Sequence, residues 1–318
     1  MTHALLLVVG GFCLYIGAEW LVRGASGLAA ALGVRPLVIG LTVVAYGTST
    51  PELVVGVGSA LSHQGPIALG NSIGSNIANL GLILGVTALV SPPKVDPGLR
   101  RRDLPALLVA TCAVPLVLLD GRISRLEGAL LLLGAFLHSA LTLRPRRVDR
   151  AELGAVQAAA ETAGAPHARS RRSLVVVSFV GLLALLAGGK LFVDGASGVA
   201  RLCGMSEHTV GLTIVAVGTS LPELATSVLA ARRGHAEVAI GNVVGSSIFN
   251  VLLILGAAGL VGSVEQPLAE LRFDLAVLGV ITLAGAGFML RPAVSRLAGA
   301  VLVAGYCAFL GGLALGVR

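Results

Sequence analysis

Charged side chains are scarce in this sequence. Asp, Glu, Lys and Arg make up 12% of its 318 residues, and 55% of the residues are hydrophobic. Soluble domains carry about 25% charged residues, so a chain this poor in charge cannot cover a surface that faces water. Apolar runs long enough to cross a bilayer as a helix recur along the whole sequence. The composition therefore excludes an ordinary soluble domain and predicts an integral membrane protein.

Cysteine is sparse too. Cys13, Cys112, Cys203 and Cys307 lie singly in apolar sequence with no CxxC spacing. We expect small buried side chains at these positions, without disulfides or soft-metal sites. The sequence carries no nucleic-acid motif and gives no reason to expect a cofactor or an obligate protein partner, so the lipid bilayer is the expected partner.

A basic segment before the first apolar run is also missing. No Lys or Arg precedes residues 5–21, and no small-residue cleavage pattern accompanies them. Because a secretory signal peptide begins with positive charge, we expect this run to remain as the first membrane span.

The apolar runs and the charged, Pro and Gly breaks between them predict an all-α polytopic membrane protein with about ten transmembrane helices. The expected ranges are 4–31, 36–61, 66–90, 103–119, 124–142, 173–203, 207–232, 236–261, 273–290 and 294–315. Residues 144–172 are the one long polar stretch and are expected to form a loop or a short surface helix.

Lys and Arg residues are divided unevenly between the two sides of this predicted bundle. Sixteen fall on the side of the 144–172 loop and five on the opposite side. Cytoplasmic loops carry the excess of positive charge, so this loop is expected in the cytoplasm and both termini outside. We expect the inner (plasma) membrane of a prokaryote, and the net charge of +7 reflects this asymmetry.

The sequence repeats itself at a constant shift of 171 residues. GLTVVAYGTSTPEL at Gly40 returns as GLTIVAVGTSLPEL at Gly211, and GNSIGSNIANLGLILG at Gly70 returns as GNVVGSSIFNVLLILG at Gly241. Eleven of 16 and ten of 16 positions match in these two blocks, against three of the 14 between them. The identity is concentrated where polar residues interrupt the apolar runs.

Two five-helix repeats follow from this shift, at 1–143 and 173–318. Their motifs are 40–55 and 70–85 in the first repeat, and 211–226 and 241–256 in the second. The motif glutamates fall on the second and seventh spans, an odd offset, so the two copies must cross the membrane in opposite directions. Inverted repeats with broken helices are typical of secondary transporters that bind substrate near the midplane. A duplicated bundle that kept only its packing residues is the alternative.

The chemistry is carried by Glu52 and Glu223, each preceded by a proline inside an apolar span. A carboxylate at this depth usually marks an ion or proton pathway. Proline with a nearby glycine should break each helix and free carbonyl oxygens. Hydroxyl groups stand one turn earlier, at Thr48, Ser49, Thr219 and Ser220.

The following span carries a polar stripe in each copy, at Asn71, Ser75 and Asn79 and at Asn242, Ser246 and Asn250. The spacing of four residues places each set on one helix face. Such residues can also join helices by hydrogen bonds alone, and the small-xxx-small glycines beside them favour close packing.

These groups offer oxygen atoms only, which hard cations such as Ca²⁺ prefer. Two facing glutamates would neutralise one Ca²⁺ or share Na⁺ ions. An empty site with two carboxylates would be costly to move through a poorly solvated interior, because transferring a bare charge costs on the order of 20 kcal/mol in the idealised limit. We therefore hypothesise obligatory exchange of ions that compete for one site.

A second set of charges lies on the first and sixth spans. Glu19 and Arg23 are four residues apart, as are Lys190 and Asp194 at the equivalent repeat positions with the signs reversed. We expect an ion pair within each helix that makes the charge tolerable. A role in holding or sliding gating helices is the alternative.

GTSTPEL with GNSIGSNIAN, and GTSLPEL with GNVVGSSIFN, resemble the two alpha repeats of the Ca²⁺/cation antiporter superfamily, above all its prokaryotic sodium/calcium exchanger branch. The resemblance covers essentially the whole chain. It implies ten helices, the first and sixth long, tilted and able to slide. It also implies an ion site made by the side chains of Thr48, Ser49, Glu52, Ser75, Asn79, Thr219, Ser220, Glu223, Ser246 and Asn250, with the carbonyls of Ala45 and Ala216.

The sequence departs from this family pattern at two places. Some exchangers carry aspartate where this chain has Asn250, so the central charge is lower and the ion stoichiometry stays open. The 144–172 loop is too short for the calcium-sensing domains of animal exchangers.

The predicted function is exchange of Ca²⁺ for Na⁺ by alternating access, not an enzymatic activity. A Ca²⁺/H⁺ antiporter that uses the same glutamates is the nearest alternative, and K⁺ also stays open as the counter-ion. A channel fits inverted repeats less well. GASG, at Gly24 and again at Gly195, fits the GxSG signature of an intramembrane serine protease, although small residues for close helix packing explain it better.

Overall fold

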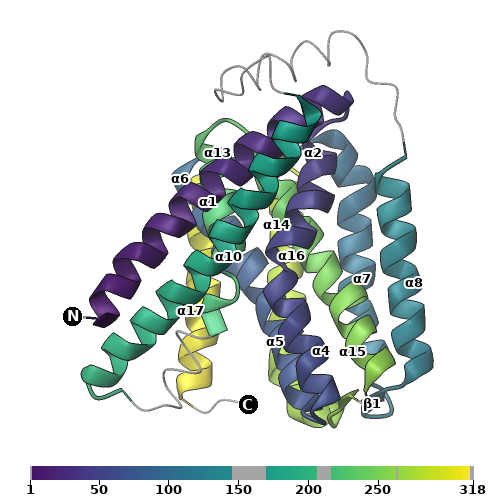
Figure 1. The fold of residues 1–318 in the computed structure, drawn as a ribbon. Helices are drawn as coiled ribbons and strands as arrows, with labels where there is room; N and C mark the ends of the chain where they lie inside the picture. Colours follow the sequence, from purple (N-terminus) through teal and green to yellow (C-terminus); the bar gives the residue numbers. More distant parts are fainter. Residues whose placement is uncertain (1, 145–169, 206–215, 263, 316–318) are drawn as a thin grey trace.

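The computed structural model describes residues 2–144, 170–205, 216–262 and 264–315, and most of them are helical (Figure 1). The α-helices are α1 (Thr2–Leu32), α2 (Pro36–Ile39), α3 (Ala45–Thr48), α4 (Thr50–Leu61), α5 (Gly65–Ile77), α6 (Leu84–Val90), α7 (Leu104–Val117), α8 (Arg125–Thr142), α10 (Arg171–Leu202), α12 (Ala216–Gly218), α13 (Leu221–Arg232), α14 (Ala236–Phe249), α15 (Gly256–Val261), α16 (Arg272–Met289) and α17 (Arg296–Ala314). The π-helical turns are η1 (Gly40–Val44), η2 (Ala78–Ile83), η3 (Leu99–Asp103) and η5 (Asn250–Leu255). The remaining elements are the 3₁₀ turn η6 (Leu268–Leu271) and two short strands, β1 (Arg122–Ile123) and β2 (Val264–Glu265).

Six helices among the described residues are long and apolar enough to cross a membrane, and a bent pair makes a seventh. The six are Thr2–Leu32, Gly65–Val90, Arg171–Leu202, Ala236–Val261, Leu268–Met289 and Arg296–Leu313. The predicted membrane class is therefore confirmed, while the count of ten spans stays a prediction. The start of the expected 207–232 helix and most of the 144–172 loop lie outside the described residues.

The outer surface of the bundle is apolar. Phe136 on α8 and Leu297 on α17 are 74% and 76% exposed, and many other large apolar side chains are also exposed. Lipid tails satisfy such a surface as well as a protein core would. For the same reason the expectation of buried cysteines is wrong. All four are free, and Cys112, Cys203 and Cys307 are exposed.

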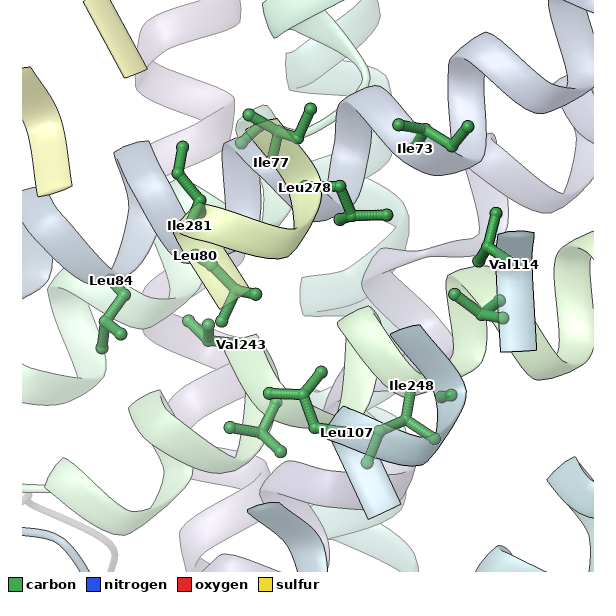
Figure 2. Packing of buried hydrophobic residues seen from close by; sticks show 14 of the residues in the cluster. Ile73, Ile77, Leu80, Leu84, Leu107, Val114, Val243, Ile248, Leu278 and Ile281 are labelled. Atoms are coloured by element: carbon green, nitrogen blue, oxygen red, sulfur yellow. The ribbon is translucent and has the colours of Figure 1, made fainter. Parts of the chain in front are cut away.

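Helix α14 lies at the centre of the protein, and every residue from Val238 to Phe249 is buried. Figure 2 shows its Val243 and Ile248 among apolar side chains of the surrounding helices. Those side chains come from the continuous segment α5–η2–α6, from α7 and from α16. They include Ile73, Ile77, Leu80, Leu84, Leu107, Val114, Leu278 and Ile281. This central position gives the polar residues of α14 no access to lipid.

The two longest helices, α1 and α10, lie side by side and obliquely to the bundle (Figure 1). Glycines spaced by seven residues line their seam at 10, 17 and 24 and at 181, 188 and 195. A Cβ atom on Gly17 would lie 2.5 Å from the Leu185 nitrogen, and one on Gly188 would lie 2.6 Å from the Leu14 nitrogen. The two backbones therefore touch and run antiparallel. This glycine period went unrecognised in the sequence.

Short backbone pairings join the two halves of the chain at both ends of α7. Arg122 pairs with Glu265 between β1 and β2, and Lys94 pairs with Ala293 in an isolated antiparallel bridge. The repeat shift of 171 residues relates Arg122 to Ala293 and Lys94 to Glu265. The two pairings thus use equivalent repeat positions, at opposite ends of a helix about 20 Å long.

The glycine seam predicts that Gly17→Ala destabilises the protein. The added methyl group would meet backbone atoms that cannot rotate away, and such overpacking costs about 1–3 kcal/mol. Thermal unfolding in detergent should show a lower Tm. Gly279→Ala on α16 is the matched control, because a Cβ there meets nothing within 4 Å. An unchanged Tm for Gly17→Ala would contradict backbone contact at this seam.

Candidate ion-binding site

Each repeat breaks a helix just before its glutamate. Pro36–Thr48 and Thr50–Leu61 meet at an angle of 49°, with Ser49 between them. In the second repeat, Ser220 stands outside the helical region with φ −91° and ψ 6°, directly before α13. Proline lies in the first turn of both restarted helices, where its missing N–H leaves no helical bond unmade. The predicted helix breaks are confirmed.

The glutamates of the two repeats are brought together by crossed hydrogen bonds. Ser49 Oγ donates to Glu223 Oε1 at 3.0 Å, and Ser220 Oγ donates to Glu52 Oε1 at 3.5 Å. Each glutamate is only 1% exposed and lies in the first turn of a helix, whose dipole stabilises negative charge. Residues about 170 positions apart thus form one buried acidic centre.

The carbonyl groups behave differently from the prediction. The Ala45 oxygen is not freed by the break, because it accepts the Ser49 N–H at 3.0 Å and the Thr48 hydroxyl at 3.5 Å. The α3 segment stays helical up to the break, so its carbonyl keeps its helical partner. Ala216, the counterpart of Ala45, begins α12.

Two asparagines fix the backbone of the glutamates. Asn71 Nδ2 donates to the Glu52 carbonyl at 3.0 Å, and Asn242 Nδ2 donates to the Glu223 carbonyl at 3.4 Å. Asn242 also accepts the Thr48 hydroxyl at 3.1 Å. The sequence analysis placed both asparagines on the polar stripes. It did not predict their bonds to the glutamate carbonyls, because these partners lie 19 residues away along the chain.

The stripes end in π-helical turns, which are frequent at functional sites. Asn79 lies in η2, and Asn250 is the first residue of η5. Ser72 Oγ donates to the Asn250 carbonyl at 2.5 Å, and Asn250 Nδ2 donates to Asn76 Oδ1 at 3.0 Å. These bonds fix the Asn250 side chain with its amide oxygen unused. Neither of these wider turns was predicted from the residues that form it.

Among the described residues, five buried oxygen atoms of the predicted ligand set have no hydrogen-bond partner. They are Oε2 of Glu52, Oε2 of Glu223, Oδ1 of Asn79, Oδ1 of Asn250 and Oγ of Ser246. A buried polar group without a partner is expensive unless something binds it. Carboxylate, amide and hydroxyl oxygens are the donors that Ca²⁺ takes, so these atoms fit a hard cation.

Two other predicted residues occupy different surroundings. Ser75 is buried, 5% exposed, on α5. Thr219 is half-buried and lines a cavity beside α10. The structure therefore brings Ser49, Ser220 and the two glutamates together, and Thr219 lines the neighbouring cavity.

The charged residues of α1 and α10 differ in their ion pairing. Glu19 pairs with Arg23 at 2.5 Å, as expected, and also with Arg233 at 2.9 Å, which the sequence did not predict. In contrast, Lys190 and Asp194 are both exposed, and no ion pair joins them in the described part of α10. The expectation of an in-helix pair is thus confirmed for α1 and wrong for α10.

The geometry gives the protease alternative no support. Ser26 and Ser197 of the GASG segments are buried, and neither hydroxyl has a hydrogen-bond partner among the described atoms. His138 Nε2 has none either, and the His138 ring packs against Phe249. No serine–histidine pair forms from these three residues, whereas Gly24 and Gly195 serve the close packing of α1 against α10.

The chain is similar to known membrane proteins over nearly its whole length. The family described as Sodium/calcium exchanger protein matches residues 2–142 and 173–314. Inner membrane protein YrbG of Escherichia coli is 36% identical over 96% of this chain and 94% of its own length. Sodium/calcium exchanger MaX1 of Methanosarcina acetivorans is 33% identical over 97% of each chain. A solved structure of the sodium-calcium exchanger NCX_Mj is 30% identical, with a TM-score of 0.84 over 98% of this chain and 99% of that one.

Asn242→Ala is expected to weaken the folded centre. It removes the amide that holds Thr48, Ser227 and the Glu223 carbonyl, and leaving such buried groups unpaired costs about 1–3 kcal/mol each. Thermal unfolding in detergent measures the loss. Ser247→Ala, equally buried on α14, is the control because Ser247 bonds only the Val243 carbonyl of its own helix. Equal Tm shifts for both variants would contradict the role of Asn242.

Exchange of Glu19 and Arg23, as Glu19→Arg with Arg23→Glu, should not be tolerated. An ion pair within α1 would survive the exchange, but the arginine at position 19 would face Arg233. We expect a loss of at least about 1 kcal/mol, because a partly buried charge loses a partner. Adding Arg233→Glu to the exchanged chain should restore the Tm, and a fully stable double variant would show that Arg233 is irrelevant.

Proposed function

The chain belongs to the sodium/calcium exchanger family, and from that premise we propose that it is an antiporter exchanging Ca²⁺ for Na⁺ by alternating access. The observation that carries the proposal is the pair of buried glutamates, held by crossed serine hydrogen bonds and each keeping one unpartnered carboxylate oxygen. MaX1 and NCX_Mj, which this chain resembles over nearly its whole length, are named as sodium/calcium exchangers.

The proposed ion site uses the acidic centre and the polar groups around it. Its side-chain ligands are Thr48, Ser49, Glu52, Ser75, Asn79, Thr219, Ser220, Glu223, Ser246 and Asn250, and the carbonyls of Ala45 and Ala216 complete it. The Ser49 N–H takes one of the two lone pairs of the Ala45 oxygen, so this oxygen can join once the Thr48 hydroxyl, 3.5 Å away, turns from it to the ion. The five unpartnered oxygens are the strongest support for this assignment.

The charge of the site accounts for exchange. Two carboxylates balance one Ca²⁺, and Asn250 adds a dipole in place of a third negative charge. In this buried centre an uncompensated pair of charges would be too costly to carry across the membrane. The loaded protein therefore changes sides more readily than the empty one, and Ca²⁺ leaves in return for Na⁺ that binds the same oxygens.

We further propose ten spans arranged as two inverted five-helix repeats, 1–143 and 173–318. The antiparallel seam of α1 and α10 and the equivalent pairings of Arg122 with Glu265 and Lys94 with Ala293 support this symmetry. The basic 144–172 loop would face the cytoplasm and both termini the outside, in the inner membrane.

Flux of radiolabelled Ca²⁺ into proteoliposomes tests the function. An outward Na⁺ gradient at fixed pH should drive uptake, whereas a K⁺ gradient or a pH gradient alone should not. Glu52→Gln and Glu223→Gln should each lower uptake by more than about 100-fold, since losing one charge of a buried ion site costs about 3–5 kcal/mol. Gln keeps the oxygen that accepts the serine hydrogen bond.

Glu127→Gln is the matched control, because Glu127 caps α8 through Ser124 and stands apart from the ion site. It should exchange at the wild-type rate. Uptake driven by the pH gradient and indifferent to Na⁺ would replace the Na⁺ proposal with a Ca²⁺/H⁺ antiporter. Full Ca²⁺ transport without any counter-ion would contradict exchange altogether.

A further inference from the structure

In the described structure, a cavity lies beside each of the long helices α10 and α1. The α10 cavity, of about 610 Å³, lies between α10 and the broken helices and is lined by Lys190 and Asp194, by Thr50 and Pro51, and by Thr219 and Pro222. The α1 cavity, of about 370 Å³, lies between α1, α6 and α13. The two cavities occupy similar places in the two repeats but differ in what they reach.

Only the α10 cavity reaches both helix breaks. Pro51 and Pro222 in its wall directly precede the two site glutamates, and Thr219 belongs to the proposed ligand set. The α1 cavity meets α13 at Leu224 and beyond, past the glutamate, and Arg232 is the charged residue in its wall. The α10 cavity therefore borders the residues that directly precede both site glutamates.

Lys190 and Asp194 both line this cavity and are exposed, and no ion pair joins either of them to another residue of the described chain. Lys190 lies 12 residues before the end of α10, about 18 Å of helix, so it is deep in a membrane span. Charges at that depth persist where they face a water-filled cavity. The equivalent residues of α1 differ, because Glu19 is neutralised by Arg23 and Arg233 and does not line the α1 cavity.

We propose that Lys190, opposed by Asp194, sets how readily Ca²⁺ relative to Na⁺ reaches the ion site through the α10 cavity. This inference rests on the proposed exchange function. The ammonium group repels each arriving cation in proportion to the cation's charge, so a divalent ion is held back more strongly than a monovalent ion. Asp194 attracts the same ions and offsets part of that repulsion.

The size of the effect follows from Coulomb's law. Across about 5 to 8 Å of water, one unit charge changes the local concentration of a divalent cation on the order of two- to fivefold after screening. For a single monovalent ion the factor is the square root of that value. Lys190 is thus a specificity-determining residue that acts before binding.

Initial rates of Na⁺-driven Ca²⁺ uptake into proteoliposomes, measured over a range of external Ca²⁺, test the inference. Lys190→Gln should raise kcat/KM for Ca²⁺ about two- to fivefold and leave kcat nearly unchanged. Asp194→Asn should lower kcat/KM by a similar factor, and the double variant should return close to the wild type. Choline chloride at about 1 M should reduce these differences, because the Debye length falls to about 3 Å.

Charge-matched variants separate electrostatics from structure. Lys190→Arg should keep the wild-type kcat/KM, and Arg125→Gln, at the start of α8 and outside the cavity wall, should have no effect. Changes of the same sign in Lys190→Gln and Asp194→Asn, no change in either, or changes that persist in high salt would each overturn the inference. A wild-type protein without Na⁺-driven Ca²⁺ uptake would instead refute the proposed function.

Discussion

The crossed hydrogen bonds from Ser49 to Glu223 and from Ser220 to Glu52 tie each half of the chain to the carboxylate of the other. A serine or threonine inside a continuous membrane helix commonly returns its hydroxyl to the carbonyl four residues earlier, as Ser247 does here. The helix breaks stop the two site serines from closing this local bond. Proline and the broken geometry therefore allow one half of the protein to complete the acidic centre of the other.

Helix α14 is buried along most of its length because its polar side chains need protein partners. Asn242 binds Thr48 on α3 and Ser227 on α13, and Asn250 binds two residues of α5, and lipid tails cannot supply such partners. The apolar side chains around α14 exclude lipid, while Asn250 and Ser246 keep oxygen atoms unpartnered. The core thus supplies hydrogen-bond partners to the asparagine amides that hold the centre and leaves oxygen atoms without a partner in the described chain that could hold a cation.

The outer pair, α1 and α10, is held together by backbone contact at glycines and not by polar side chains. Glycines at every seventh position give a seam of bare backbone with little interdigitation of side chains. The pair meets the broken helices over cavities, and its charges have diverged between the repeats. Glu19 binds Arg233 at the end of α13, whereas Lys190 and Asp194 remain in the α10 cavity. Equivalent backbone positions therefore carry different electrostatic roles.

The sequence alone determined the membrane class, the repeat, the helix breaks at Pro51 and Pro222 and the polar stripes, since all of these depend on local composition or on self-similarity. The helix ranges agreed with the structure within a few residues wherever both are described. The tertiary structure decided which atoms meet. The asparagine bonds to the glutamate carbonyls, the π-helical turns and the Glu19–Arg233 pair depend on packing between segments 19 to 214 residues apart. Local rules reach only about one or two helix turns along the chain, so no pattern in the sequence fixes those contacts.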